Sequence, residues 1–277
     1  MKDYVKYGNI EIGLPTATIG YFGIFQDLTD FFGVEYQSEA VSLLKRALKT
    51  NEDIKPKPHI DYEADNTHID SRNADTIFKV AEIINSLTVA EFKIDLSTSE
   101  KQEILQQLKA WKRPKAKKWA VGDIFSIKLT DRSFMFGQVV GTHLTKKAPT
   151  CALFELRKTA EETSVEELKN SRVISVENTS NENLSDGTFK VLFHCESFAK
   201  AEQAKKDKST GDTTLLRLCN AYYGLEPWNV LYKDTFYDEM LLQGIMRPTT
   251  VLILDKEARD KYRLERFGID ENNERVR

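Results

Sequence analysis

The stretch from Trp119 to Val140 constrains the fold of this chain more than any other, because it reads as two strands and a turn. In each half, large apolar side chains fall on one face by strand alternation. They are Phe125, Ile127 and Leu129 in the first half and Phe134, Phe136 and Val140 in the second. The polar tripeptide Thr130–Arg132 stands between the two halves. The stretch therefore predicts a β-hairpin.

Glycines mark two points of this hairpin where the backbone needs freedom. Gly122 and Asp123 precede the first strand, which is typical of a tight turn, and Gly137 lies inside the second strand. A glycine in a strand interior favours a bulge or a sharp bend. We therefore expect the sheet that contains this hairpin to be curled.

The same residues resemble the opening of the immunity protein 26 family. The resemblance is carried by Val-Gly-Asp-Ile-Phe-x-Ile-x-Leu over residues 121–129 and by Phe-x-Phe-Gly-Gln-Val-Val over residues 134–140. It covers roughly Trp119 to Phe267, with its specific part in the hairpin. Proteins of this family are bacterial and neutralise a cognate secreted toxin by binding it. The resemblance thus implies a cytoplasmic binding protein that needs no cofactor and has no catalysis of its own.

Length and composition bound the domain number and the class of protein. The length of 277 residues favours two domains, since domains commonly have about 100 to 200 residues. No run approaches the roughly 18 apolar residues of a membrane-spanning helix, and the first twenty residues do not read as a secretory signal. We therefore expect a cytoplasmic protein without a membrane partner. Forty basic and 43 acidic residues give a net charge of -3, which argues against a dedicated nucleic-acid-binding protein.

A basic stretch marks the expected domain boundary. Six of the ten residues from Lys109 to Lys118 are Lys or Arg, and Pro114 stops the helix that precedes it. We expect an N-terminal α+β domain over residues 1–111, a solvated basic linker over 112–118 and a β-rich domain over 119–277. The competing interpretation, a basic run that binds nucleic acid or an acidic partner, is less favoured because the run lacks interleaved aromatic residues.

Periodicity assigns the other elements. The expected helices are residues 40–49, 76–87, 198–208, 215–223 and 256–267, and one more that begins at a capping box, Ser97–Glu100. The expected strands are residues 59–62, 91–96, 151–157, 172–176, 188–194 and 250–254, while residues 13–33 receive no assignment. Asp186–Gly187 reads as a hairpin turn between antiparallel strands. The predicted fold is α+β: a curled, mainly antiparallel sheet or partial barrel with helices on one side, preceded by a small α+β domain.

Candidate catalytic and metal sites are sparse. His59, Asp61 and Glu63 would share a strand face and could hold a cation, but an acidic edge strand that resists aggregation explains them without a ligand. His194 and Cys195 are adjacent, so on a strand they point to opposite faces and cannot act as a base and its nucleophile. We expect no metal ion, no cofactor and no catalytic residue.

The hairpin also supports the competing class of function. Asp123, Asp131 and Arg132 could supply the carboxylate and guanidinium groups of a nuclease site, since small curled sheets that open with Gly-Asp also occur in bacterial ribonuclease toxins. Turn chemistry accounts for these residues more simply, and few basic residues flank the hairpin. A nucleic-acid-binding or ribonuclease-like small-barrel protein is therefore the second hypothesis. His143, at the end of a strand, is expected to be solvated.

An aromatic and acidic segment, residues 221–240, is the candidate surface for a protein partner. Tyr and Trp dominate interface hot spots, and here they alternate with carboxylates that suit a basic partner. The candidate partner-binding residues are Trp228, Tyr232, Asp234 and Asp238. The competing interpretation places most of these rings in the core of the C-terminal domain. The sequence thus predicts an immunity protein that occludes a cognate toxin by stoichiometric binding, with no nucleic acid among its partners.

Overall fold

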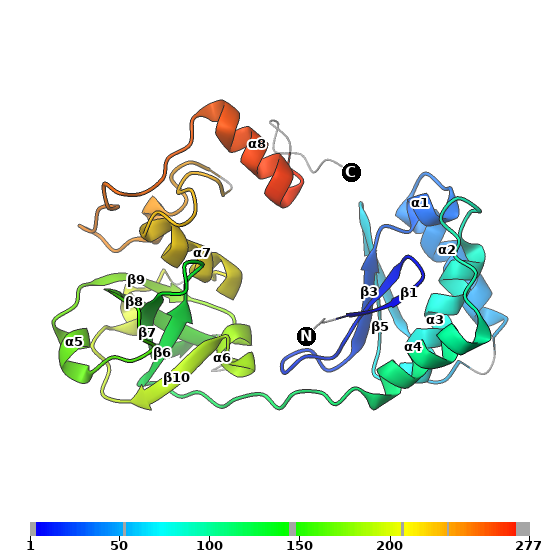
Figure 1. The fold of residues 1–277 in the computed structure, drawn as a ribbon, viewed down its shortest axis with the longest axis horizontal. Helices are drawn as coiled ribbons and strands as arrows, with labels where there is room; N and C mark the ends of the chain where they lie inside the picture. Colours follow the sequence, from blue (N-terminus) through cyan, green and yellow to red (C-terminus); the bar gives the residue numbers. More distant parts are fainter. Residues whose placement is uncertain (1–3, 52–53, 144–147, 206–207, 232, 270–277) are drawn as a thin grey trace. The chain divides into compact units, whose positions relative to one another are not determined.

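The structure is a computed structural model that describes residues 4–51, 54–143, 148–205, 208–231 and 233–269. The chain divides into two compact units, residues 1–115 and 116–277, and each unit holds one five-stranded antiparallel sheet (Figure 1). The α+β class expected from the sequence is confirmed.

The sheet of the N-terminal unit has the strand order β1–β2–β3–β5–β4, with every neighbouring pair antiparallel. Its strands are β1 (Tyr4–Tyr7), β2 (Ile10–Gly13), β3 (Phe22–Gln26), β4 (His59–Glu63) and β5 (Asn66–Ser71). Because side chains alternate along a strand, Ile12, Ile24 and Ile69 fall side by side on one face and are fully buried.

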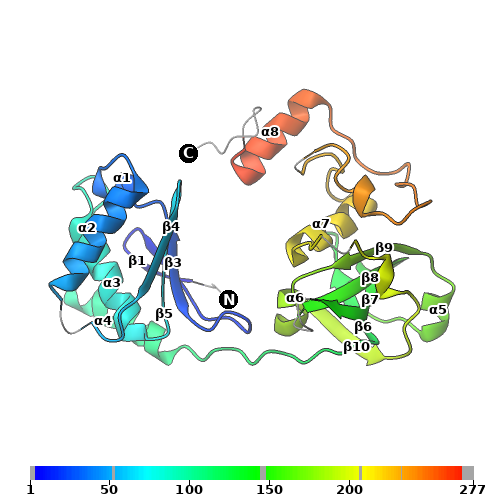
Figure 2. The same cartoon turned by 180° about the vertical axis from the view of Figure 1, so that it is seen from behind.

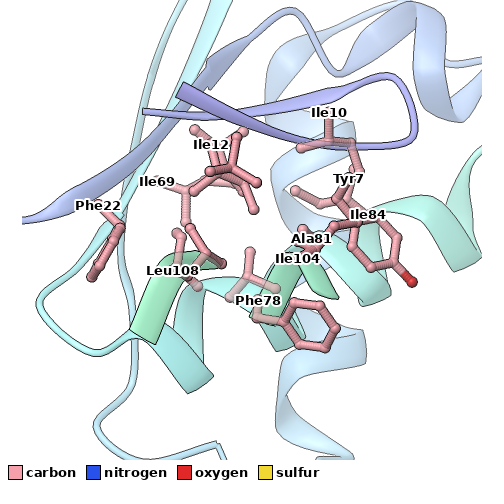
Figure 3. Packing of buried hydrophobic residues seen from close by; sticks show 14 of the residues in the cluster. Tyr7, Ile10, Ile12, Phe22, Ile69, Phe78, Ala81, Ile84, Ile104 and Leu108 are labelled. Carbon is pink, nitrogen blue, oxygen red and sulfur yellow. The ribbon is translucent and has the colours of Figure 1, made fainter. Parts of the chain in front are cut away.

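Helices cover that apolar face of the sheet (Figures 1 and 2). They are α1 (Thr29–Phe32), α2 (Gln37–Lys49), α3 (Ala74–Leu87) and α4 (Thr98–Ala110). Figure 3 shows strand residues such as Ile12 and Ile69 facing Leu108 and other apolar residues of α3 and α4 in a single core. The predicted capping box opens α4: Glu100 N–H donates to the Ser97 hydroxyl, and Ser97 N–H donates to the Glu100 carboxylate.

Two stretches of the N-terminal unit differ from the sequence-based expectation. The strand predicted at residues 91–96 is wrong, because these residues form a turn and an irregular segment. The Asn85 side chain replaces the missing strand partner: it donates to the carbonyl of Ile94 at 2.9 Å and accepts from its N–H at 3.2 Å. The unassigned residues 13–33 contain strand β3 and helix α1.

The sheet of the C-terminal unit has the order β10–β6–β7–β8–β9 and is also antiparallel throughout. Its strands are β6 (Asp123–Lys128), β7 (Phe134–His143), β8 (Ala148–Lys158), β9 (Val173–Asn178) and β10 (Phe189–His194). The predicted hairpin is confirmed as β6 and β7, and the strands predicted at residues 151–157, 172–176 and 188–194 are confirmed as β8 to β10. β9 and β10 lie at opposite edges, so the sheet does not close into a barrel.

Both faces of this sheet are packed. On one face, Phe125 belongs to a core with Leu218 of α7 (Asp212–Tyr222), and on the other, Phe136 packs with Leu168 of α5 (Val165–Lys169). The Phe125 ring stacks on that of Phe189 in β10, with centroids 5.5 Å apart and planes within 6°. The remaining helical elements are α6 (Glu182–Asp186), α8 (Lys256–Phe267) and the 3-10 turns Ala201–Gln203 and Asp238–Met240.

Gly137 is required by the packing of the Phe125 ring rather than by a bulge at its own position. It stands opposite Phe125 across β6 and β7, and a β-carbon at this position would lie 2.4 Å from Cζ of that ring. The register shifts of β7 against β8 lie on either side of it, at 135–136 and 139–141. The strand is thus irregular, as expected, while the glycine makes room for an aromatic ring.

Three predicted elements of the C-terminal unit are wrong. Asp186–Gly187 ends helix α6 and does not join two paired strands, since β9 and β10 are at opposite edges. Residues 250–254 form only one isolated bridge, and the described part of 198–208 contains only the 3-10 turn. In this last segment the carbonyls of Lys205 and Lys208 accept hydrogen bonds from the side-chain amide of Asn178 in β9. A strand side chain therefore binds backbone carbonyls that would accept the hydrogen bonds of a helix.

No helix within the described ranges is long and apolar enough to cross a membrane.

The stretch 112–118 is exposed, but each of its ends is tied to one unit. The Arg113 guanidinium donates to the carbonyls of Thr16 and Ala17, and Lys117 N–H donates to the carbonyl of Ser185. Between these ties, Pro114, Lys115 and Ala116 bond to neither unit in any hydrogen bond of the described residues.

We predict that the two units fold independently and that limited trypsin digestion cuts first between Lys112 and Lys118, because exposed backbone without cross-packing is open to a protease. The bond before Pro114 resists trypsin, so the peptide bond after Lys115 is the preferred position. Mass spectrometry of the early fragments checks this result. First cuts elsewhere in the described chain, with residues 112–118 intact, would contradict the boundary.

Candidate functional site

The turn before β6 is built around the carboxylate of Asp123. One carboxylate oxygen accepts from Ala120 N–H at 2.8 Å, and the other lies 3.0 Å from Nδ1 of His194 in β10. The Asp123 side chain is 12% exposed and that of His194 is 64% exposed. Gly122 has φ +101°, and the His194 ring lies so close that a β-carbon there would be 2.6 Å from Cε1. Asp123 therefore closes a turn and ties β6 to the edge strand.

Gln138, the polar residue of the second half of the hairpin, is fully buried and performs a similar structural task. Its amide nitrogen donates to the carbonyl of Glu196 at 3.1 Å, and its amide oxygen accepts from Phe198 N–H at 2.9 Å. The side chain thus holds the segment after β10 against the sheet. The polar residues of the hairpin motif maintain the fold, and their polar atoms are committed to it.

The turn residues considered for a nuclease site are also committed to structure. Asp131 accepts hydrogen bonds from N–H and Oγ of Ser133, at 3.0 and 2.6 Å, and pairs with Arg157. These donors stabilise the ionised carboxylate and lower its pKa from 3.8 to about 2. Arg132 occupies the left-handed region with φ +71°, as a turn position requires. Asp123 lies at the far end of β6 from this turn, so the structure does not bring the three residues together.

The histidines give no metal or nucleophilic site. No group of three or more His, Cys, Asp or Glu residues within the described chain could hold a metal ion. His59 pairs with Asp70, with 2.9 Å between Nδ1 and Oδ2. His143 is the last residue of β7 and is half-buried, so the expectation that it is solvated is wrong. Burial lowers its pKa, because the charged imidazolium loses hydration there.

The four candidate partner-binding residues have different positions. Trp228 is fully buried in the core, 5.3 Å from the ring of Tyr237 and 6.5 Å from that of Tyr222. Tyr232 lies outside the described residues. Asp234 and Asp238 are on the surface, with side chains 57% and 35% exposed. The structure therefore places Trp228 in the core, where the competing interpretation put most of these rings.

Both surface aspartates face arginines from later in the chain. Nη1 of Arg259 lies 2.7 Å from each carboxylate oxygen of Asp234. Arg263 is buried beside this pair and donates to the carbonyls of Val230 and Leu231, which fixes α8 to the segment. Asp238 lies 3.6 Å from Arg247. Exposed ion pairs contribute little to stability, so exchange with a partner's charges costs little.

The C-terminal segment also exposes large apolar side chains that the sequence pattern did not single out. They are Met246 at 81% exposure, Leu252 at 45%, Ile253 at 47% and Leu264 at 47%. Leu252 and Ile253 lie in the stretch expected to be a strand, and Leu264 lies in the expected helix at residues 256–267, but the pattern marked none of the four as exposed. We call these four residues, together with Asp234 and Asp238, the C-terminal surface; it combines apolar and acidic groups.

We expect Asp131→Asn to lower the free energy of unfolding at pH 7, because the amide cannot pair with Arg157 as the carboxylate does. A pKa lowered in the folded state adds stability above the pKa of the unfolded chain, and this stability is lost as the pH falls toward 2. The gap between the wild type and the variant should therefore narrow from pH 5 to pH 3 in urea unfolding. Glu162→Gln, at an exposed position, is the control with no gap. If the difference in the free energy of unfolding stays constant or grows on acidification, the pKa of Asp131 is not lowered in the folded state.

Trp228→Ala should destabilise the C-terminal unit by about 3–5 kcal/mol, the usual cost of removing a buried tryptophan. Met246→Ala, in the same segment, should change the stability by less than about 0.5 kcal/mol because its side chain is exposed. Denaturant unfolding followed by tryptophan fluorescence and circular dichroism measures both. A Trp228→Ala protein that is as stable as the wild type would show that the indole is not a core residue.

One segment of the chain is similar to a known family. Residues 120–214 match the family model of Immunity protein 26. The match begins just before β6 and ends within α7, so it contains the whole sheet of the C-terminal unit. Over this segment it confirms the family expected from the hairpin. No curated protein and no solved structure matched the chain.

Proposed function

We propose that this chain is an immunity protein that binds a cognate secreted bacterial toxin in the cytoplasm and neutralises it by stoichiometric occlusion. The observation that carries the proposal is the match of residues 120–214 to the Immunity protein 26 family. That family suggests toxin immunity, and immunity proteins are generally not enzymes. Occlusion requires a complementary surface and no cofactor.

The bonding of the hairpin residues supports binding rather than catalysis. The polar side-chain atoms of Asp123 and Gln138 form hydrogen bonds with His194 and with backbone groups. A catalytic carboxylate would have to reach a substrate, whereas the Asp123 side chain is nearly buried beneath the turn. The hairpin is therefore suited to be the scaffold of a binding protein, with the toxin contact elsewhere on its surface.

The C-terminal surface is our candidate for that contact. It offers a large exposed apolar side chain, Met246, and carboxylates that can set the orientation of a basic partner, such as Asp238, which lies 3.6 Å from Arg247, the residue after Met246. Methionine is flexible and polarizable, which suits an interface anchor. Trp228 supports this surface from within the core instead of contacting the toxin.

The decisive experiment is a titration of the toxin with the purified full chain. The toxin candidate is the product of a large reading frame immediately upstream of the gene. We expect complete protection at an equimolar ratio and a stable one-to-one complex in size-exclusion chromatography. Protection at far less than one molecule per toxin would require turnover and would overturn the proposal, as would no complex at all.

The same titration with Met246→Asp tests the surface. Placing a charge at a desolvated apolar anchor should weaken binding at least tenfold, and the thermal midpoint should not change because Met246 is 81% exposed. Val165→Asp is the matched control, since Val165 is an exposed apolar residue of α5 outside this surface. An equal loss of toxin binding in the two variants would show that the C-terminal surface is not the contact. It would not contradict the proposed function.

A further inference from the structure

One face of the N-terminal sheet is covered by helices, and no helix described in that unit packs on the other (Figures 1 and 2). The strand register brings Phe25, His68 and Asp61 into one row across this open face, because Phe25 pairs with His68 and His68 with Asp61. They belong to β3, β5 and β4, so the row runs from the middle of the sheet to its edge. Its composition changes from aromatic to acidic along the way.

The aromatic end of this row is a partly exposed cluster of rings. Phe25 is 64% exposed, although it is a large apolar residue in the central strand of the sheet. The His68 ring centroid lies 5.9 Å from that of Phe25 and 5.9 Å from that of Tyr21. Single exposed apolar residues are ordinary, but two rings that each contact His68 on an open sheet offer flat π surfaces to a ligand.

Two glycines beside these rings have no explanation within the fold. Gly13 and Gly23 stand opposite each other in β2 and β3, and neither has a positive φ. A β-carbon at Gly23 would meet nothing closer than 3.8 Å, and one at Gly13 would meet only the carbonyl of Gly23 at 3.4 Å. Glycine weakens a strand interior, and there it often marks a close approach by a ligand or another backbone. The pair leaves two neighbouring positions of the open face without side chains, which we call the glycine trough; Nε2 of His68 and Cε2 of Tyr21 lie 3.8 and 4.0 Å from where a β-carbon at Gly23 would stand.

The charge of this face is acidic. Strand alternation places four carboxylates and one lysine on it, namely Glu11, Asp61, Glu63, Asp70 and Lys6. Lys6 pairs with Glu11 at 3.0 Å and His59 with Asp70 at 2.9 Å. Among the described residues, the ion pairs on this face are those of Glu11 and Asp70, and none involves Asp61 or Glu63. The uncompensated charge therefore lies at the β4 edge, next to the ring cluster.

We propose that this open face is a docking site for an arginine-bearing, extended segment of another protein. The backbone of the segment would lie in the glycine trough, where no side chain of the sheet obstructs it. Its guanidinium groups would stack on the rings of Phe25, His68 and Tyr21 and form bidentate bonds with Asp61 and Glu63. Planar stacking together with carboxylate pairing favours arginine over lysine. The proposal rests on the N-terminal unit alone, which lies outside the family match.

The test measures binding of a fluorescently labelled deca-arginine peptide to the full chain by fluorescence anisotropy, with deca-lysine as the comparison. We expect deca-arginine to bind at least fivefold more tightly than deca-lysine. Gly23→Val should weaken deca-arginine binding at least tenfold by filling the trough, without lowering the thermal midpoint, because the β-carbon has room and valine favours strands. Asp61→Lys/Glu63→Lys should weaken it at least as much.

Glu162→Lys/Glu166→Lys is the matched control, since it makes the same change of net charge at two exposed positions of the C-terminal unit. This variant should bind deca-arginine within twofold of the wild type. An equal loss in the control would mean that only net charge attracts the peptide, and equal binding of deca-lysine would mean that the rings take no part. Either result, or unchanged binding by Gly23→Val, would overturn the proposal. Because the probe is a peptide, none of these outcomes depends on the toxin titration.

Discussion

The C-terminal unit depends on the contact of one aromatic ring with a backbone that has no side chain. Phe125 lies flat against Phe189 on one neighbouring strand and over Gly137 on the other. If a β-carbon stood at position 137, the ring would be displaced, and the layer that Leu218 and Trp228 complete could not close as it does. The hairpin motif therefore includes a glycine at position 137 because the Phe125 ring occupies the space of a side chain there. The packing of the sheet and the turn before β6 therefore both depend on this short run of residues.

The sequence predicts an element well when burial alone decides its structure. The hairpin and the helices α3 and α8 follow from alternation and from a 3.6-residue period. The two false strands, at residues 91–96 and 250–254, show where this reasoning fails. In each, an asparagine side chain supplies the donor and acceptor of a strand partner: Asn85 binds both backbone groups of Ile94, and Asn229 binds both of Leu254, at 2.8 and 3.0 Å. Such extended segments have the composition of strands. The asparagines that bind them lie 9 and 25 positions earlier in the chain, so local sequence does not reveal the interaction.

The candidate contact surface was only partly predictable for a related reason. Trp228 has the residue type of a hot spot, but the same large apolar area that suits an interface also suits a core, and composition does not separate the two. Asp234 reads as a free carboxylate until α8 brings Arg259 to it across 25 residues. Met246 carries no periodic signal at all. The acidic character of the segment was readable from the sequence, whereas the identity of its exposed groups required the fold.

The strand order has a consequence for the synthesis of the chain on the ribosome. β6 is the first strand of its sheet to be made, yet one of its two neighbours, β10, is the last, and about 60 residues separate the end of β6 from Phe189. At roughly 5–20 residues per second, the ribosome takes about 3 to 12 s to deliver that neighbour. Throughout this interval the Phe125 ring lacks its stacking partner and one edge of β6 stays unpaired. The nascent chain is therefore most open to mispairing with other chains just before residue 189 emerges, and an early chaperone contact would protect this edge.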